Sequence, residues 1–269
     1  KAALGPSTAA ICQAAKARGI PVSRLELENL LILGYGRRQQ RVWATISGLT
    51  SALGSDLASD KHLTKQLLSR GGIPVPEGFV VEDLAGATAA WQALDCPVVV
   101  KPLTGNHGKG VTLNIQTAAE LARAFDFARQ YDRQVIVEQY LPGQQYRLCV
   151  VNGKLAAAAE RIPACVVGDG IHTVAQLVDM VNADLRRGEG HAKPLTKIQL
   201  DAAAIAVLAK QGLNPASVPA AQRMVFIRET SNLSTGGTAV DVTDIVHPSI
   251  VYMAERAAQL VGLDIAGVD

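Results

Sequence analysis

The sequence has almost no excess of charge of either sign. Its 26 lysines and arginines, against 24 aspartates and glutamates, leave a net charge of +2 on 269 residues. So small a charge gives no global attraction to nucleic acid or to an anionic membrane surface. The short basic run at residues 37–41 is interpreted as a solvated turn or an internal anion contact. We therefore expect no nucleic-acid partner.

Cysteines are few and widely separated. The four residues Cys12, Cys96, Cys149 and Cys165 form no C-x-x-C pair. This spacing favours a reduced, cytoplasmic protein and suggests no zinc site.

Long apolar runs and a secretion signal are also missing. No stretch approaches the ~20 apolar residues that span a bilayer. The N-terminus lacks the charged, apolar and cleavage regions of a signal peptide. We expect no membrane partner. Because the chain starts without methionine and stops at Asp269, we expect it to be cut from a longer protein.

The order of patterns along the chain predicts several compact units. A length of 269 residues is enough for two or three domains. We expect a helix from Ser7 or Thr8, as N-cap, to Arg18, and a second helix over residues 61–70 capped by Asp60. Apolar runs at 30–33 and 42–46 predict a hairpin-like pair.

A small α+β unit is predicted beyond the prolines at positions 74 and 76. Its expected strands are 78–81, 98–101, 111–115 and 134–139, and its expected helices are 85–94 and 118–131. Asn152-Gly153 then predicts a hairpin of strands 146–151 and 154–161. A long irregular and helical excursion follows over 162–221, then a strand at 223–228 and a helix at 248–261.

Four features predict a bound nucleotide. A buried strand places Lys101 before the loop of residues 105–110, where three glycines allow backbone N–H groups to approach phosphate. This loop is not a Walker A motif, because Leu103 and Gly110 replace its glycine and hydroxyl residues. The strand before residues 138–141 ends in side chains suited to an adenine edge, and Lys61 starts a helix. Taken singly, an ordinary turn, a hinge strand and a surface lysine remain open.

Taken together, these residues resemble the ATP-grasp superfamily, and within it the ligase domain of cyanophycin synthetases. The resemblance covers essentially the whole chain. It rests on the segments 5–8, 59–61, 100–103, 105–108, 160–163, 167–170, 193–197 and 232–237.

The resemblance implies an α+β ATP-grasp fold in which two α+β subdomains grip ATP. It divides the chain into the N-terminal part of the core at 1–75, a small lid at 76–142, and the rest of the core at 143–269. The core then carries a long mixed insert at about 162–221 and is truncated at its C-terminal end.

The resemblance also implies roles for particular residues. For ATP it indicates Lys61, Lys101, Asn106, His107, Gly108, Lys109, Gly110, Glu138, Gln139, Tyr140, Leu141 and Gln145. For the acyl phosphate, acceptor or transition state it indicates His107, Arg147, Arg161, Asn232 and Ser234. For the peptide end or incoming amino acid it indicates Ser7, Asp56, Thr235 and Gly236. Asp269 would be the first of three metal ligands.

The implied activity is an ATP-dependent ligase that adds aspartate to the poly-aspartate backbone of cyanophycin. Bringing a γ-phosphoryl group to a carboxylate joins two anions, so cationic side chains and Mg²⁺ must offset their repulsion. The implied partners are a cyanophycin primer and an amino acid. We also expect a homo-oligomer, and a Mur-ligase-like domain in the full-length parent.

Three positions depart from the family pattern. Gln145 replaces the usual acidic residue for the ribose hydroxyls, and Cys165 stands where a histidine is expected. The Glu-x-Asn metal ligands that should follow Asp269 are absent from this sequence. We expect the chain alone to bind ATP poorly and not to turn over.

Two other interpretations remain open. The chain could act on another substrate, as a polymerase of β-Asp-Arg dipeptides or as a ligase of the glutathione synthetase or D-Ala–D-Ala ligase type. Arg186, Arg187 and the segment 193–197 favour an extended or polyanionic partner, unless the insert is a packing appendage. The second interpretation is a non-catalytic nucleotide-binding or oligomerisation module.

Overall fold

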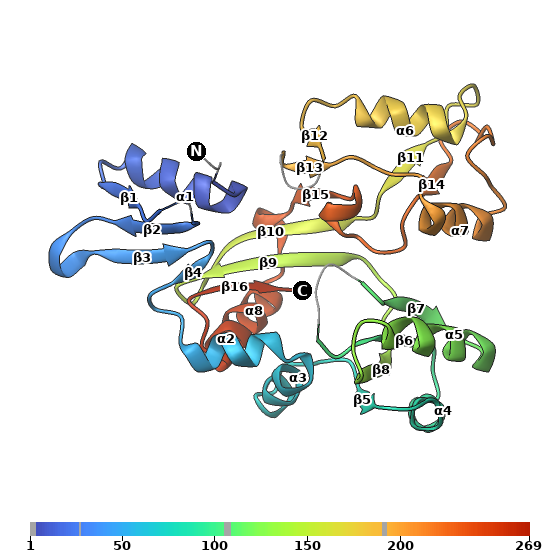
Figure 1. Cartoon of the computed structure of the whole chain (residues 1–269), viewed down its shortest axis with the longest axis horizontal. Coiled ribbons are helices and arrows are strands. Elements are labelled where there is room, and N and C mark those ends of the chain that lie inside the picture. Colours follow the sequence, from blue (N-terminus) through green and yellow to red (C-terminus); the bar gives the residue numbers. More distant parts are fainter. Residues whose placement is uncertain (1–3, 27, 105–108, 190–192) are drawn as a thin grey trace. The chain divides into compact units, whose positions relative to one another are not determined.

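The structure is a computed structural model that describes residues 4–26, 28–104, 109–189 and 193–269. The chain forms two compact units (Figure 1). Unit 1 contains Lys1–Ser51, Gln145–Val246 and Asp264–Asp269, and unit 2 contains Ala52–Gln144 and His247–Leu263. In the described ranges, no helix combines the length and the apolar character that crossing a membrane requires.

Unit 2 is built on an antiparallel sheet in the order β5-β8-β6-β7. Its strands are β5 (Gly78–Val81), β6 (Val98–Pro102), β7 (Thr112–Ile115) and β8 (Val135–Gln139). Its helices are α2 (Ala52–Ser59), α3 (Lys61–Arg70), α4 (Leu84–Leu94), α5 (Ala118–Arg129) and α8 (Pro248–Val261). Helix α3 packs against α2 and α8, whereas α4 and α5 pack against the sheet.

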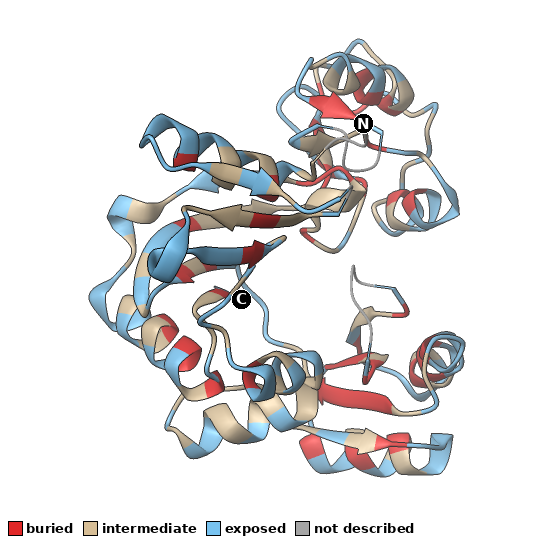
Figure 2. Cartoon of the chain, turned by 60° about the vertical axis from the view of Figure 1, so that its left-hand side comes forward, coloured by how far each residue is buried: buried red, intermediate tan, exposed pale blue. Residues whose placement is uncertain are grey.

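Alternation along the strands of this sheet gives it two faces, one of which packs against α4 and α5. Val98, Val100, Val135 and Val137 join the apolar residues of α4 and α5 in one buried cluster, and the strands stand out as buried in Figure 2. Successive strand residues point to opposite faces of a sheet. Lys101 and Glu138, which directly follow Val100 and Val137 in their strands, therefore lie on the other face.

Unit 1 contains two four-stranded sheets. The first, in the order β1-β2-β3-β4, has the strands β1 (Val22–Arg24), β2 (Leu30–Leu33), β3 (Gln40–Trp43) and β4 (Ile46–Ser47), and α1 (Pro6–Ala17) packs on β1 and β2. The second, in the order β15-β10-β9-β16, has the strands β15 (Thr238–Asp241), β10 (Lys154–Ile162), β9 (Gln145–Val151) and β16 (Ile265–Val268). Short 3₁₀ helices are η1 (Gly36–Arg38), η2 (Leu233–Thr235) and η3 (Thr243–Ile245).

The expected insert folds around an apolar core of its own. It contains β11 (Cys165–Val167), α6 (Val174–Asn182), β12 (Arg187–Gly188), β13 (Leu195–Thr196) and α7 (Ala202–Lys210). Strand β11 pairs with β14 (Met224–Phe226), and Val166, Val225 and Ile227 pack with residues of both helices. The apolar core of the insert therefore includes residues beyond position 221, because the strand expected at 223–228 packs into it.

Most expected elements form, and two local expectations are wrong. The N-cap of α1 is Gly5, two or three residues earlier than the expected Ser7 or Thr8, and Pro6 lies in the first turn of the helix. Proline suits the first turn of a helix, because the N–H group that it lacks would have no intrahelical partner there. Helix α2 was not expected at all, because its composition gives no strong start signal. The bounds predicted for the core and lid stay a prediction.

Candidate functional site

A group of lysines surrounds one buried carboxylate in unit 2. Glu138, on β8, is 5% exposed. Its Oε2 accepts a hydrogen bond from Lys65 Nζ at 2.6 Å, and its Oε1 pairs with Lys101 Nζ. Lys61 Nζ donates to the carbonyl oxygen of Pro102, the residue after Lys101, at 3.1 Å. We call Lys61, Lys65, Lys101 and Glu138 the lysine cluster.

The backbone places the members of the lysine cluster by simple rules. Lys61 and Lys65 are four residues apart on α3 and therefore lie on one helix face. In the β6–β8 pair, Glu138 lies opposite Val99 and Lys101 lies opposite Ile136. Lys101 and Glu138 are thus diagonal neighbours on the same sheet face.

A glycine on the neighbouring strand makes room for the carboxylate. Gly78 on β5 lies directly opposite Glu138 on β8. A Cβ atom at position 78 would meet Glu138 Cβ at 2.5 Å, and the carbonyl oxygen of Val137 at 2.8 Å. The close approach of the two strands at this point therefore requires glycine.

The charges of the lysine cluster do not balance. The ammonium groups of Lys65 and Lys101 pair with the single carboxylate of Glu138, and Lys61 lies close enough to be influenced by both Lys101 and Glu138. The four side chains therefore carry an excess of positive charge. Burial, and then the positive charge of Lys101, lower the pKa of Lys61, and Glu138 and Asp132 oppose this shift. An arriving phosphate group would relieve the repulsion between the lysines. The cluster is therefore suited to bind an anion.

The segment around the glycine loop is anchored at both ends. Asp132 Oδ2 accepts hydrogen bonds from Thr104 N at 2.8 Å and from Thr104 Oγ1 at 2.6 Å. Gly110 has φ +70°, and a Cβ atom there would meet Tyr131 at 2.7 Å and Pro102 at 2.8 Å. Of the predicted phosphate loop, Lys109 is exposed and Gly110 is buried. The predicted residues Asn106, His107 and Gly108 lie outside the described residues.

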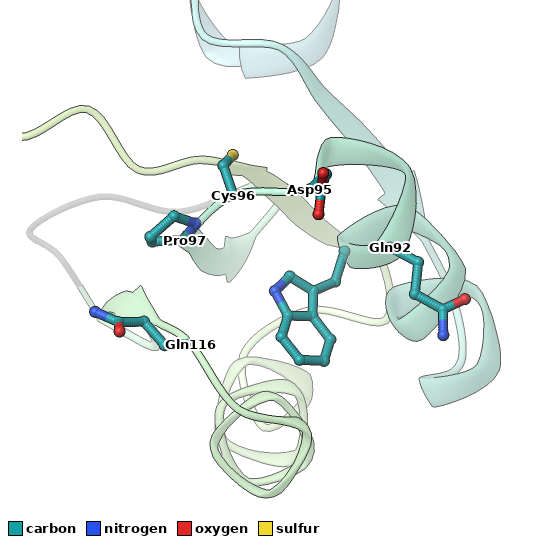
Figure 3. Close-up of a pocket in the computed structure, with 6 residues that line it drawn as sticks. Gln92, Asp95, Cys96, Pro97 and Gln116 are labelled. Carbon is teal, nitrogen blue, oxygen red and sulfur yellow. The ribbon is translucent and has the colours of Figure 1, made fainter.

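The predicted adenine segment follows β8. Tyr140 N donates to the carbonyl oxygen of Pro97 at 2.8 Å, and Leu141 is 64% exposed. Pro97 also lines a hollow of about 550 Å³, together with Trp91, Gln92, Asp95, Cys96 and Gln116 (Figure 3). The adenine contacts of residues 138–141 stay a prediction, and the structure adds two lysine partners for the Glu138 carboxylate.

Two predicted arginines share one carboxylate in unit 1. Arg147 Nη1 lies 3.1 Å from Asp269 Oδ2, and Arg161 Nη1 lies 3.1 Å from Asp269 Oδ1. Arg147 Nη1 also donates to the carbonyl oxygen of Gly267 at 2.9 Å. Arg161 lies opposite Gln145 and Arg147 lies opposite Ala159, which puts both arginines on one face of the sheet. One carboxylate leaves this pair with excess positive charge.

The predicted residues after position 231 form one tight turn. Asn232 Oδ1 accepts from Ser234 N at 3.1 Å and from Ser234 Oγ at 3.0 Å. Thr235 Oγ1 donates to the carbonyl oxygen of Asn232 at 3.0 Å, and Gly236 has φ +96°. The buried Ser231 beside this turn hydrogen-bonds to the side chain of Gln145. We call residues 232–237 the Asn-Gly turn.

The part of the chain that the structure describes shows no cluster of metal-binding side chains. Among the described residues, no group of three His, Cys, Asp or Glu side chains could hold a metal ion. The carboxylate of Asp269, the predicted metal ligand, forms ion pairs with Arg147 and Arg161. Binding of Mg²⁺ stays a prediction.

The remaining predicted residues lie apart in the chain, and sequence reasoning missed one member of the site. Ser7 is exposed on α1 in unit 1, and Asp56 is exposed on α2 in unit 2. Lys65 was not predicted, although its spacing of four from Lys61 is the signal that would have found it. Arg186 and Arg187, expected to favour a polyanionic partner, are engaged within the insert: Arg186 pairs with Asp184, and Arg187 is buried.

Comparisons with known proteins show what the chain is similar to. Residues 66–152 match the ATP-grasp domain family. The chain is 46% identical to cyanophycin synthetase from Nostoc sp. over 269 residues, which is 100% of this chain and 30% of that protein. It is 38% identical to the glutathione biosynthesis bifunctional protein of Listeria innocua, covering 98% of this chain and 35% of that protein.

A solved structure extends the likeness to three dimensions. The bifunctional glutathione synthetase from Pasteurella multocida matches with a TM-score of 0.70 and 34% identity, covering 98% of this chain and 36% of that chain. The chain has the ATP-grasp fold, of the α+β class. The particular resemblance to cyanophycin synthetases expected from the sequence is also confirmed, at 46% identity. The chain spans about 30% of the length of these curated relatives.

Proposed function

We propose that the chain carries an ATP-dependent carboxylate–amine ligase, which adds aspartate to the poly-aspartate backbone of cyanophycin. The observation that carries the proposal is the lysine cluster, in which Lys65 and Lys101 pair with one buried carboxylate and Lys61 donates to the carbonyl oxygen of Pro102 beside them. Similarity to cyanophycin synthetase over the whole chain supports the choice of substrate.

In this proposal the lysine cluster binds the phosphates of ATP. Lys61 and Lys101 contact phosphate oxygens, and Glu138 keeps Lys101 at the end of β6. A fixed ammonium group stabilises charge without the reorganisation that water would need. Lys65 holds the second oxygen of Glu138, so that the carboxylate cannot turn away. Losing one preorganised contact of this kind typically costs about 10²–10³ in rate.

The reaction proceeds in two steps. An oxygen of the substrate carboxylate attacks the γ-phosphorus of ATP, the bond to the β-phosphate oxygen breaks, and ADP leaves. The amine of the incoming amino acid then attacks the acyl carbon, and inorganic phosphate leaves as the amide forms. The amine loses one proton in this step. Each step concentrates negative charge on oxygen atoms, which is why cationic and N–H donors are needed.

Arg147, Arg161 and the Asn-Gly turn are proposed to serve the acyl phosphate and the acceptor. The two guanidinium groups present fixed donors on one sheet face. Arginine is suited to this task because its planar donors match carboxylate and phosphate oxygens. The Asn-Gly turn adds backbone and hydroxyl groups held by internal hydrogen bonds.

A second candidate substrate is favoured by the structural match. The bifunctional glutathione synthetase has the TM-score of 0.70 reported above, and this favours a ligase that extends a short peptide by one amino acid. A polymerase of β-Asp-Arg dipeptides uses the same two steps with a different acceptor.

The cytoplasmic location, the homo-oligomer and the Mur-ligase-like domain stay predictions.

The test is ATP-dependent phosphate release by the full-length protein. The acceptors are a short poly-aspartate primer and an aspartyl-arginine primer, each offered with aspartate, arginine or β-Asp-Arg dipeptide. We expect release with the poly-aspartate primer and aspartate, and its loss in the Lys101→Met variant but not in Lys16→Met, an exposed position on α1. Release with dipeptide alone would assign the dipeptide polymerase, and release with no pair would refute the ligase.

A further inference from the structure

One arginine of the insert is buried without a role in the proposed reaction. Arg187, on β12, is 5% exposed. Its Nη1 donates to the carbonyl oxygen of Thr196 at 2.6 Å and to that of Gly236 at 2.9 Å. Thr196 belongs to the insert, whereas Gly236 belongs to the Asn-Gly turn. A single guanidinium nitrogen therefore joins the two segments.

Burying this charge is costly, which makes its position informative. Burial lowers the pKa of Arg187, with Asp184 opposing the shift. The neighbouring Arg186 is exposed, and its guanidinium pairs with Asp184 through Nη2 at 2.7 Å. A buried cation needs hydrogen-bond partners that compensate for lost hydration. For Arg187, two backbone carbonyl groups fill that need.

A second contact fixes the same glycine from the insert. A Cβ atom at position 236 would meet Ile198 Cγ1 at 2.7 Å and Ile198 Cα at 3.0 Å, so Gly236 lies directly against Ile198. Asn182, at the end of α6, holds the backbone of Ile198 on both sides. Its Nδ2 donates to the carbonyl oxygen of Ile198 at 2.8 Å, and its Oδ1 accepts from Ile198 N at 2.8 Å.

The insert therefore constrains the turn at Gly236. Gly236 is held by Arg187 at its carbonyl oxygen and by Ile198 at its Cα, while its φ of +96° is open mainly to glycine. Gly237 N in turn donates to the carbonyl oxygen of Asn232 at 3.1 Å. A displacement of Gly236 would move the donors of Ser234 and Thr235.

We propose that Arg187 is a positioning residue that holds the Asn-Gly turn in the form that receives the acceptor substrate. This inference rests on the ligase function proposed above. It gives the insert a task within the reaction, since α6, β12 and β13 together fix one loop of the site. It also means that Arg187 acts through Gly236 and does not itself contact the substrate.

The experiment compares three variants of the full-length protein. Arg187→Met removes both hydrogen bonds, and Arg187→Lys keeps the charge but not the planar guanidinium. Arg186→Met is the matched control, because it changes the adjacent residue, whose side chain is exposed. Backbone hydrogen exchange is measured for residues 234–237 and, as an internal reference, for the β9–β10 pair.

Steady-state kinetics provide the second measurement. We expect Arg187→Met to lower kcat/KM for the acceptor by about 10²-fold, the loss typical of a misplacement of about 1 Å. ATP affinity should not change, because the lysine cluster is untouched. Arg187→Lys should fall between Arg187→Met and the wild type. A merely structural role would weaken ATP affinity and acceptor use together, in proportion to the loss of stability.

The two measurements separate failure of this inference from failure of the ligase proposal. Faster exchange in residues 234–237 with an unchanged β9–β10 pair supports positioning, even if no substrate pair releases phosphate. Unchanged exchange in Arg187→Met, or exchange that rises equally in Arg186→Met, overturns it. If Arg187→Met does not fold, the same comparison is made with Arg187→Lys. Equal loss of ATP affinity and acceptor use in a folded variant also overturns it.

Discussion

Lys65 Nζ lies 2.6 Å from Glu138 Oε2, although 73 positions separate the two residues. The contact joins α3 to a strand in the middle of the sheet of unit 2. Lys65 Nζ also donates to the carbonyl oxygen of Pro76 at 3.2 Å. Because Lys101 shares the same carboxylate, the middle of α3 and the end of β6 are connected through one acidic side chain.

Removing the charge of Glu138 should destabilise the protein strongly. Glu138→Gln leaves Lys65 and Lys101 without their carboxylate, and loss of one partner from a buried pair costs about 3–5 kcal/mol. Urea unfolding measures the change. Lys65→Met in the same background should recover part of it, since one unpaired ammonium group is then gone.

The control for this cycle is Glu77→Gln, at an exposed position just before β5. It removes the same charge and should change the free energy of unfolding by less than about 0.5 kcal/mol. Strictly additive effects of Glu138→Gln and Lys65→Met would contradict the coupling.

A methyl group on Gly78 should displace the same carboxylate. Gly78→Ala places Cβ at 2.5 Å from Glu138 Cβ, so one strand must shift. Overpacking of this kind costs about 1–3 kcal/mol. We expect thermal unfolding to show this loss and isothermal titration to show weaker ATP binding. Gly48→Ala, where the nearest atom is 3.9 Å away, serves as control. Normal ATP affinity in Gly78→Ala would show that the position of Glu138 does not matter.

The lowered pKa of Lys61 predicts how ATP binding depends on pH. ATP favours the protonated ammonium group, so affinity should fall as pH rises through the pKa of Lys61 in the free protein. Burial and the charge of Lys101 lower that pKa. The affinity for ATP should therefore begin to fall at a lower pH than it would if Lys61 had the pKa of a solvent-exposed lysine. Lys61→Arg keeps its charge because the guanidinium pKa exceeds 12. Titrations from neutral to alkaline pH should show a flatter profile for this variant; identical profiles would exclude Lys61 as the titrating group.

Asp132 predicts a loss of stability in acid. Burial alone would raise its pKa, but hydrogen bonds from Thr104 and from the backbone outweigh burial and lower it. Because the pKa of Asp132 is lower in the folded protein than in the unfolded chain, its ionised carboxylate stabilises the fold at pH values above the unfolded pKa of about 3.9. This stabilisation is lost as the pH falls through the folded-state pKa. Asp132→Asn should therefore be less stable at neutral pH, by about 1 kcal/mol, and the difference should shrink in acid.

Urea midpoints at neutral and acidic pH measure this difference. Asp126→Asn, at an exposed position on α5, controls for loss of one negative charge. A difference between wild type and Asp132→Asn that stays constant into acid would contradict the assignment to this carboxylate.

The sequence predicted the elements whose patterns are local. Helix α3 forms over residues 61–70 with Asp60 accepting hydrogen bonds from His62 N and Leu63 N, as its cap signal indicates. The hairpin around Asn152 and Gly153 forms because both residues adopt positive φ, at 51° and 70°. Local backbone preferences decide such cases without help from the rest of the chain.

The sequence could not predict contacts that depend on three-dimensional neighbours. The pairing of β11 with β14 joins residues 165–167 to residues 224–226 across two helices. The roles of Arg186 and Arg187 differ only because one side chain points to solvent and the other into the insert. A run of two arginines looks the same in either case, so a charge pattern alone cannot tell a surface from a buried anchor.

The alternation of β6 and β8 limits how this region can change during evolution. Insertion or deletion of a single residue within either strand would exchange its two faces, placing Lys101 or Glu138 among the valines under α4 and α5. We therefore expect such length changes to disrupt both the fold and the lysine cluster. Homologous sequences should vary in length at the connections between strands, while inside the strands they should differ only by substitution.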